Sequence, residues 1–519
     1  MKTKGAIAAG HPETARAAGA ILEEGGNAFD AALAAMCVAC VAEPVLASLG
    51  GGGFLLARRG AGEIDVFDFF THTPKRQRAE AEVEFFPVLA DFGTATQEFH
   101  IGMGSMATPG AVKGLFEAHR ALASMPMSRI VEPAVSLARR GVPINRLQAY
   151  ILGVVGRIYV SNAECRALFG GADENDRPTG EGGELRMPAF ADTLEALARE
   201  GEDLFYRGEV ARRIAEDCRT GGGLLSMDDL ACYGVERRRP LTIAALGARL
   251  FTNPPPSSGG ILIAFALELL RGENPRALGF GSAAYVERLA DVMAMTNKAR
   301  LESRLHEHDA ANAAETLLDP DLLAVYRREV RGHPAASRGT THISIIDAGG
   351  NAASLSLSNG EGSAYIVPGT GIMLNNMLGE EDINVGGFHQ WPEDARMSSM
   401  MAPSLIVGDA GDMVAMGSGG SNRIRTALLQ VMLNLRAFDM PLAQAVGSPR
   451  LHFEEGLLSI EDDFGEAESA ALAQAFPDAE LWAERNMFFG GVHAVRFEPA
   501  TKHFDGAGDP RRGGVTVIA

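Results

Sequence analysis

The spacing of apolar and polar residues divides the chain into a helix-rich first part and a strand-rich last part. Runs of helix-forming residues recur from about 107 to 240, and further helices are predicted within 253–270 and 283–300. From residue 341 onward, short alternating segments bounded by glycine and other turn residues predict strands. We therefore expect a fold that combines helical and sheet layers.

The first seventy residues predict one helix packed against two strands. In "GGNAFDAALAAMCVACV", Asn27 precedes a long run of strong helix formers, so it is expected to cap a buried helix that ends before Pro44. The segments "LGGGGFLLARRG" and "EIDVFDFF" follow as strands, and the glycine run permits close backbone approach. This is the first predicted pair of layers.

The segment "THISIIDAGGNAASLSLS" predicts a hairpin that turns at Gly349. Counting outward from this glycine pairs Thr340 with Ser358, His342 with Ser356, and Ser344 with Ser354. The hydroxyls then share one face, and the opposite face is apolar, with Ile343, Ile345, Leu355 and Leu357. A row of hydroxyls can simply pair across strands, which is the structural interpretation.

The glycine before Thr340 supports a chemical interpretation of the same hairpin. If the backbone broke between Gly339 and Thr340, Thr340 would carry both a hydroxyl nucleophile and an α-amine with an ordinary pKa of about 7.7–8.0. Glycine has no Cβ, so its carbonyl is open to attack by that hydroxyl. A threonine at the head of a core strand is then explained as a future chain terminus.

Two later segments could serve acyl transfer. In "MGSGGSNRIRTALLQVML", a strand end is followed by Gly417 to Gly420 and a helix starting near Ser421, so the amides of Gly419 and Gly420 are candidates to bind an oxyanion. In "RMSSMMAPSLIVG", Ser398 and Ser399 precede a strand. These serines either grip a substrate carboxylate or cap a turn.

Composition excludes several classes of protein. The chain has 519 residues, of which 46% are apolar and 22% charged, as expected of two globular domains or one large unit. A net charge of −19 disfavours nucleic acid and anionic membrane partners. The amino-terminal apolar run is broken at residues 11–13, and no stretch is long enough to span a membrane, so we expect a cytoplasmic protein.

Metal, redox and nucleotide chemistry find little support. Cys37 and Cys40 have redox-motif spacing, but they lie in an alanine-rich helix and no second pair completes a zinc site, so all five cysteines are expected as reduced thiols. His306 and His308 lie in a charged stretch without an HExxH pattern, and we interpret them as solvated. The chain has no Gly-Lys dipeptide, which excludes a P-loop.

Taken together, these segments resemble the γ-glutamyltranspeptidase (glutathione hydrolase) family of N-terminal nucleophile hydrolases. The resemblance covers nearly the whole chain, and the GTTH and SSM-P elements are specific to the family. The matching motifs occur in family order: "GGNAFDAALAA", "SLGGGGFLL", "ATPGAVKGL", "LFYRGEVARRIAED", "NPPPSSGG", "GTTHISIID", "GIMLNNM", "SSMMAPSLIV", "GSGGSNRI" and "DPRRGG".

The resemblance implies an α+β fold with four αββα layers and self-cleavage between Gly339 and Thr340. A large chain, 1–339, and a small chain, 340–519, would then associate, and a higher oligomer is left open. Thr340 would be the nucleophile, Ser358 would assist its new amine, and Gly419 and Gly420 would bind the oxyanion. No cofactor or metal is implied.

The resemblance also implies a substrate site with three departures from the family. Ser398 and Ser399 match the serines that hold the glutamyl α-carboxylate, but Phe70 replaces the arginine that clamps it, and a phenyl ring cannot replace a bidentate donor. Glu380 is left to meet a substrate α-amine, with a different reach from the family's paired aspartates. Asn359 follows Ser358 in a stretch shorter than the family's and is kept as a substrate-binding candidate.

Three functions follow from these residues. The first is a self-processing γ-glutamyl hydrolase or transferase that acts on a small amide or peptide through an acyl-enzyme on Thr340. The second is a related amidase or acylase for a non-glutamyl amide. The third is a catalytically silent binding protein, whose signature would be the loss of Thr340 or the glycine pair, and neither is lost.

Overall fold

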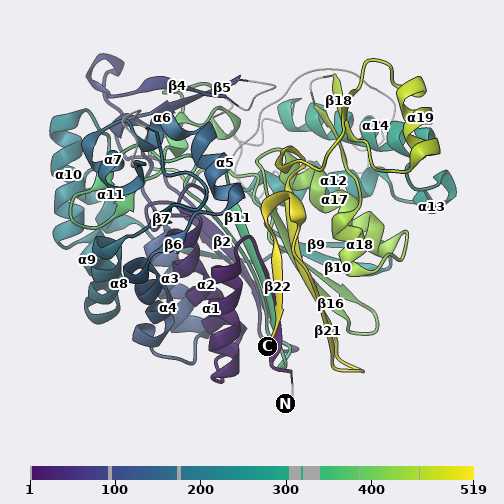
Figure 1. The fold of residues 1–519 in the computed structure, drawn as a ribbon, viewed down its shortest axis with the longest axis horizontal. Coiled ribbons are helices and arrows are strands. Elements are labelled where there is room, and N and C mark those ends of the chain that lie inside the picture. Colours follow the sequence, from purple (N-terminus) through teal and green to yellow (C-terminus); the bar gives the residue numbers. More distant parts are fainter. Residues whose placement is uncertain are drawn as a thin grey trace.

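Two antiparallel sheets form the centre of the molecule (Figure 1). The computed structural model describes residues 3–91, 96–171, 177–302, 317–318, 339–384, 386–454 and 456–519. The first sheet has the order β22 (Val515–Ile518), β1 (Gly5–Ala9), β11 (Thr341–Asp347), β12 (Ala352–Ser358), β2 (Gly52–Arg58), β3 (Ile64–Phe69) and β8 (Glu236–Arg238). The second has the order β21 (His503–Ala507), β20 (Gly491–Glu498), β16 (Met413–Gly419), β15 (Ser404–Gly408), β10 (Ala248–Thr252) and β9 (Leu241–Ala245).

The two sheets pack face to face, with helices on both outer sides (Figure 1). Strands β11 and β12 contact β16, and β1 contacts β20. Helices α1 (Pro12–Glu23) and α2 (Ala28–Ala42) cover the first sheet, while α12 (Ser258–Leu269), α14 (Ala283–Glu302) and α17 (Arg423–Arg436) lie on the side of the second. One hydrophobic core fills the space between α2 and the first sheet, and the other lies between the sheets and extends to α12 and α17.

Helix α2 confirms the prediction for the first layer. Asn27 caps it by accepting hydrogen bonds from the Phe29 and Asp30 amides, and the Asp30 carboxylate accepts one from the Asn27 amide, which completes a capping box. Every residue of the helix is buried, because its small side chains sit between the first sheet and the neighbouring helices. The helix ends at Ala42, before Pro44 as predicted.

A helical lobe fills residues 111–232, as the pattern predicted, and lies on the α1 and α2 side of the molecule (Figure 1). Its helices are α3 (Ala111–Leu122), α4 (Met127–Arg140), α5 (Arg146–Val154), α6 (Gly156–Tyr159), α7 (Ala163–Phe169), α8 (Pro188–Glu200), α9 (Asp203–Tyr206), α10 (Glu209–Gly221) and α11 (Met227–Cys232).

The chain after residue 341 is less uniformly stranded than predicted. It contains the expected strands β11, β12, β15, β16, β20 and β22 and the predicted helix α17, but two further helices, α18 (Leu442–Gly447) and α19 (Glu466–Ala475), were not predicted. Helix α17 was expected to begin near Ser421, but it begins at Arg423, because β16 continues through Gly419 and Ser421 adopts a left-handed φ of 51°. Each sheet thus receives strands from both parts of the chain.

The predicted hairpin register is confirmed. In the ladder between β11 and β12, His342 pairs with Ser356 and Ser344 with Ser354. The apolar face of the hairpin, Ile343, Ile345, Leu355 and Leu357, lies in the core beneath α2. The hydroxyl face therefore points toward the second sheet, where β16 and β20 lie against it.

Within the described ranges, no helix is both long and apolar enough to cross a membrane.

Candidate active site

Two hydroxyl groups converge on the carbonyl of Gly339. Thr340, which is 6% exposed, donates a hydrogen bond from Oγ1 to Gly339 O at 2.8 Å. Ser358 at the end of β12 donates to the same oxygen, also at 2.8 Å. The register places Ser358 opposite Thr340, so the hairpin itself creates this arrangement. A carbonyl with two hydroxyl donors is polarised, and its carbon is the electrophile nearest to the Thr340 hydroxyl.

The segment after β12 fixes the other side of this centre. The Gly360 amide donates to Ser358 Oγ at 3.1 Å, and Glu361 Oε1 accepts a hydrogen bond from the Gly339 amide at 3.0 Å. Gly360 has a left-handed φ of +62°, and a Cβ there would lie 2.1 Å from Asn376 Oδ1 and 2.9 Å from Glu380 Oε1. Glycine is thus required at this position, and the buried Glu380 lies within a few ångströms of the Ser358 loop.

The rest of the hydroxyl face is structural. His342 pairs through Nδ1 with Ser356 Oγ at 2.8 Å and through Nε2 with Ser344 Oγ at 2.9 Å. Ser344 Oγ and Ser354 Oγ donate to carbonyl oxygens of the second sheet. Burial, with His493 nearby, lowers the pKa of His342 well below its ordinary value, so this imidazole is neutral. The hydroxyl row therefore pairs across the strands along most of its length, and at its end Thr340 and Ser358 converge on Gly339 O.

The predicted oxyanion glycines lie directly beside Thr340. A Cβ added to Gly419 would come within 2.1 Å of Thr340 O, so any other residue would push the two segments apart. Gly420 has φ +120°, in the region that favours glycine. The Ser421 hydroxyl donates to Asp382 Oδ2, which links this turn to the segment after Glu380. The structure therefore brings the glycine pair, Thr340 and the Glu380 segment together.

Ser398 and Ser399 have different environments. Ser399 is buried, its Oγ accepts a hydrogen bond from the Met401 amide at 3.1 Å, and its carbonyl accepts from the Ser258 amide at 2.8 Å. This is the turn-capping interpretation. Ser398 is half-buried and lines a pocket of about 440 Å³. Of the two serines, Ser398 is the one placed to meet a ligand there.

The pocket beside Ser398 has a mostly apolar wall. Its other lining residues are Thr73, Ile383, Asn384, Gly386, Gly387, Gln390, Trp391, Pro392, Ala395, Arg396 and Met397. Arg396 is the cation among them, and its guanidinium donates to the carbonyls of Phe70 and Gly234 and to the Tyr233 hydroxyl. It also lies 3.7 Å from the buried carboxylate of Asp68. Arg396 is therefore held by protein groups.

Phe70 and Asn359 are both buried. Phe70 is 1% exposed, and its ring stacks on Phe54 with centroids 5.5 Å apart, inside the core between the sheets. Asn359 is fully buried, and its side-chain amide has no hydrogen-bond partner within the described part of the chain. An unsatisfied buried amide next to Ser358 is the kind of group that a bound polar ligand would pair.

The two cysteines with redox-motif spacing lie in the core, as predicted. All five are free thiols, and Cys37 and Cys40 are buried in α2. Burial raises the pKa of Cys37 to about 12, which removes thiolate chemistry at neutral pH. Among the residues that the structure describes, no three His, Cys, Asp or Glu side chains form a metal-binding group. His306 and His308 lie outside the described residues.

Sequence reasoning missed two charged residues of the centre. Arg512 of "DPRRGG" donates from Nη1 to Thr340 O at 3.4 Å, and Glu361 of "NGEGSAY" holds the Gly339 amide. Both motifs are present in the sequence, but nothing in their spacing indicated that Arg512 meets Thr340, which lies 172 residues earlier. Only the pairing of β20 with β16, and of β22 with β1, brings the carboxyl-terminal turn to Thr340.

Comparisons with known proteins agree with this geometry. A model of the gamma-glutamyltranspeptidase family matches residues 14–519. The glutathione hydrolase proenzyme of Escherichia coli (strain K12) is 32% identical over 474 residues, which cover 84% of this chain and 78% of the relative. The acylase ACY 1 proenzyme of Pseudomonas sp. (strain SE83) is 29% identical over 517 residues, which cover 96% of this chain and 90% of the relative. The crystal structure of cephalosporin acylase from Bacillus halodurans superposes with a TM-score of 0.81 at 24% identity, over 99% of this chain and 96% of that one.

The family match indicates an enzyme of the N-terminal nucleophile hydrolase class. The chain belongs to the γ-glutamyltranspeptidase family, as the resemblance implied. Within that family it is similar both to glutathione hydrolases and to acylases.

Proposed function

We propose that the chain is a self-processing amide hydrolase or acyltransferase of the γ-glutamyl type, with Thr340 as its nucleophile. The observation that carries this proposal is the convergence of the Thr340 and Ser358 hydroxyls on Gly339 O, each at 2.8 Å. The glycine pair beside Thr340 offers backbone amides as candidate donors to the oxyanion.

We expect processing to proceed from this arrangement in three steps. Thr340 Oγ1 attacks the Gly339 carbonyl carbon, and the developing charge on Gly339 O is stabilised by the hydrogen bond from Ser358. The C–N bond then breaks as the nitrogen takes the hydroxyl proton, which leaves Gly339 esterified to Thr340 Oγ1. Water hydrolyses this ester, and the products are a Gly339 carboxylate and a Thr340 with a free α-amine.

Turnover uses the groups that processing exposes. The neutral α-amine accepts the Thr340 hydroxyl proton while Oγ1 attacks the substrate amide, and the oxyanion is bound by the Gly419 and Gly420 amides. The leaving amine takes the proton, and the acyl ester on Thr340 is then cleaved by water or by an acceptor amine. Chains 1–339 and 340–519 stay associated, because each contributes strands to both sheets of the proposed αββα sandwich.

A second candidate concerns the acyl group. Phe70 occupies the position where the resemblance implies a carboxylate-clamping arginine, and its ring is buried against Phe54. The cation of the pocket beside Ser398, Arg396, is held by Phe70 O, Tyr233 and Asp68. These contacts favour an amidase for an acyl group without an α-carboxylate.

The test is the mass of the denatured protein beside that of Thr340→Ala and Thr340→Ser. We expect the wild-type chain to give two fragments that break at Gly339–Thr340, and the alanine variant to stay intact and inactive. Thr340→Ser retains a hydroxyl nucleophile and should still be cleaved. An intact, inactive wild-type chain would instead favour the silent binding protein.

Substrate screening then separates the two candidates. The p-nitroanilides of γ-glutamate, glutarate and hexanoate differ in the α-amine and in the charge of the acyl group. A γ-glutamyl hydrolase should prefer the first by at least tenfold in kcat/KM. A preference for hexanoate would assign the chain to an acylase for an acyl group without a carboxylate. A preference for glutarate would show that the carboxylate is recognised and the α-amine is not, which would contradict the second candidate.

A further inference from the structure

Three glycines make room for the side chain of Arg512. A Cβ at Gly491 would lie 2.5 Å from Arg512 Cδ, so the aliphatic part of the arginine crosses this glycine. Added Cβ atoms at Gly419 and Gly420 would lie 3.3 Å and 3.1 Å from its two terminal nitrogens. The guanidinium therefore rests on the backbone of the glycine pair.

The same guanidinium reaches the nucleophilic residue. Arg512 Nη1 donates to Thr340 O at 3.4 Å, and the side chain is 3% exposed. Burial, together with the nearby Arg423, lowers the pKa of Arg512 to about 10, which still leaves the group charged at neutral pH. Arg512 thus places a positive charge behind both the glycine pair and the Thr340 carbonyl.

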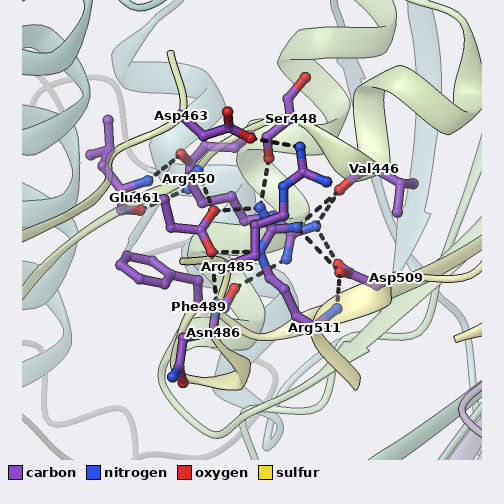
Figure 2. A network of polar contacts seen from close by, with 12 residues as sticks. Val446, Ser448, Arg450, Glu461, Asp463, Arg485, Asn486, Phe489, Asp509 and Arg511 are labelled. Carbon is purple, nitrogen blue, oxygen red and sulfur yellow. Dashed lines mark hydrogen bonds and ion pairs between the residues drawn. The ribbon is translucent and has the colours of Figure 1, made fainter. Parts of the chain in front are cut away.

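A buried network anchors the turn that carries Arg512 (Figure 2). Asp509, at the start of this turn, pairs with Arg450 at 2.6 Å and with Arg511 at 3.2 Å. Arg511 also pairs with Glu461, and Asp509 Oδ2 accepts a hydrogen bond from the Val492 amide at 2.8 Å. Asp509, Arg511 and Glu461 are almost fully buried, so the position of the turn is well determined.

We propose that Arg512 is a positioning residue that clamps the Thr340 carbonyl and the Gly419–Gly420 turn in one arrangement once the chain is cut. The proposal rests on the proposed function, because it requires Thr340 to become an amino terminus. Cleavage removes the covalent link to Gly339, and the β11 ladder holds the chain only from Thr341 onward. Terminal residues are poorly ordered unless they are tied down, and Arg512 supplies the tie.

The clamp also has an electrostatic consequence. The guanidinium lies against the two glycines whose amides face the oxyanion, and a fixed positive charge at that distance favours negative charge on the substrate oxygen. A residue with this role affects the chemical step more than substrate binding. We therefore expect substitutions of Arg512 to lower kcat while leaving KM within about threefold of the wild-type value.

The experiment measures kcat and KM of the variants Arg512→Lys, Arg512→Gln and Thr340→Ala. Arg485→Gln is the matched control. Arg485 belongs to the same region in Figure 2, but it is 42% exposed and pairs with the exposed Asp463. We expect Arg512→Gln to lower kcat about 100-fold and Arg512→Lys about tenfold, because lysine keeps the charge but not the forked contact. Arg485→Gln should behave as the wild type.

The outcomes separate this proposal from the proposed function. Activity in Thr340→Ala would overturn both, whereas full kcat in a cleaved Arg512→Gln, with Thr340→Ala inactive, would overturn only the clamp. A folded Arg512 variant that no longer cleaves itself supports the clamp, since Thr340 must be held during cleavage as well. Loss of cooperative thermal unfolding in both Arg512 variants would show that the fold itself needs this arginine, and it would overturn the proposal.

Discussion

The centre around Thr340 and the pocket beside Ser398 are built in different ways. The centre consists of backbone groups and short hydroxyls fixed by strand register, with glycines at the closest approaches. The pocket consists of side chains such as Trp391, Met397 and Ile383, carried by the segments 383–392 and 395–398.

This difference teaches which part of the site is free to vary. Any side chain at Gly419 or Gly360 would collide with the backbone or with buried polar atoms, so the centre tolerates little change. A pocket wall can exchange one side chain for another and keep its shape, so the same centre can serve different acyl groups. The similarity of this chain to both glutathione hydrolases and acylases agrees with that division.

The largest expected effect comes from a methyl group in the centre. Gly419→Ala would place a Cβ 2.1 Å from Thr340 O, so we expect the glycine turn to move away and kcat to fall by roughly 10²–10³-fold. Gly447→Ala is the matched control, since a Cβ there meets no atom within 4 Å. Steady-state kinetics on the best p-nitroanilide checks the effect, and a Gly419→Ala enzyme with wild-type kcat would contradict this account of the centre.

The centre was also the part most predictable from the sequence. A hairpin register depends on alternation and on one turn, and both are local, so counting from Gly349 placed His342 opposite Ser356 correctly. Thr340 was proposed from the glycine that precedes it and Gly419 from a glycine-rich strand end, whereas the role of Ser358 came from the resemblance to the family. The role of Arg512 was not predicted, because its contact with Thr340 depends on the order of strands in each sheet, which alternation does not encode. The contact of Glu361 with Gly339 depends on the path of the loop after β12, which the residue pattern does not determine.

The pocket was less predictable for a related reason. Ser398 and Ser399 are adjacent and chemically identical in sequence, yet one lines the pocket and the other caps a turn against Ser258. The burial of Phe70 against Phe54 depends on how the second sheet covers the first. Such differences come from tertiary packing, and the residue types alone do not determine them.

A smaller effect on catalysis is expected from placing a cation at position 70. Phe70→Arg should raise kcat/KM for γ-glutamyl p-nitroanilide relative to hexanoyl p-nitroanilide about tenfold, which corresponds to about 1.4 kcal/mol. Because Phe70 is buried, the variant should also lose roughly 3 kcal/mol of unfolding free energy.

Phe70→Leu is the control for that experiment, because it changes the size of the side chain without adding charge. It should leave the substrate ratio unchanged. An unchanged substrate ratio in a folded, active Phe70→Arg enzyme would show that position 70 does not contribute to acyl recognition. Arg396 and Ser398 would then be the remaining candidates for recognising the acyl group in the pocket.

A last effect concerns the pH dependence of stability, because buried charges anchor the turn that carries Arg512. Burial opposes ionisation of Asp509, but Arg450, Arg511 and two backbone amides outweigh it and lower the pKa of its carboxyl from 3.8 to about 2. A carboxyl whose pKa is depressed in the folded state stabilises the fold above its unfolded pKa, and this contribution is lost as the pH falls from about 4 to 2.

We expect the difference in unfolding free energy between the wild type and Asp509→Asn to shrink by about 2 kcal/mol between pH 5 and pH 2. Urea denaturation at a series of pH values measures this difference, and because other carboxylates titrate in both proteins, their contributions largely cancel. Ser398→Ala, in the pocket, should show a difference from the wild type that does not vary with pH. If the difference in unfolding free energy between the wild type and Asp509→Asn stayed constant over this pH range, the charged network would not hold the Arg512 turn through Asp509.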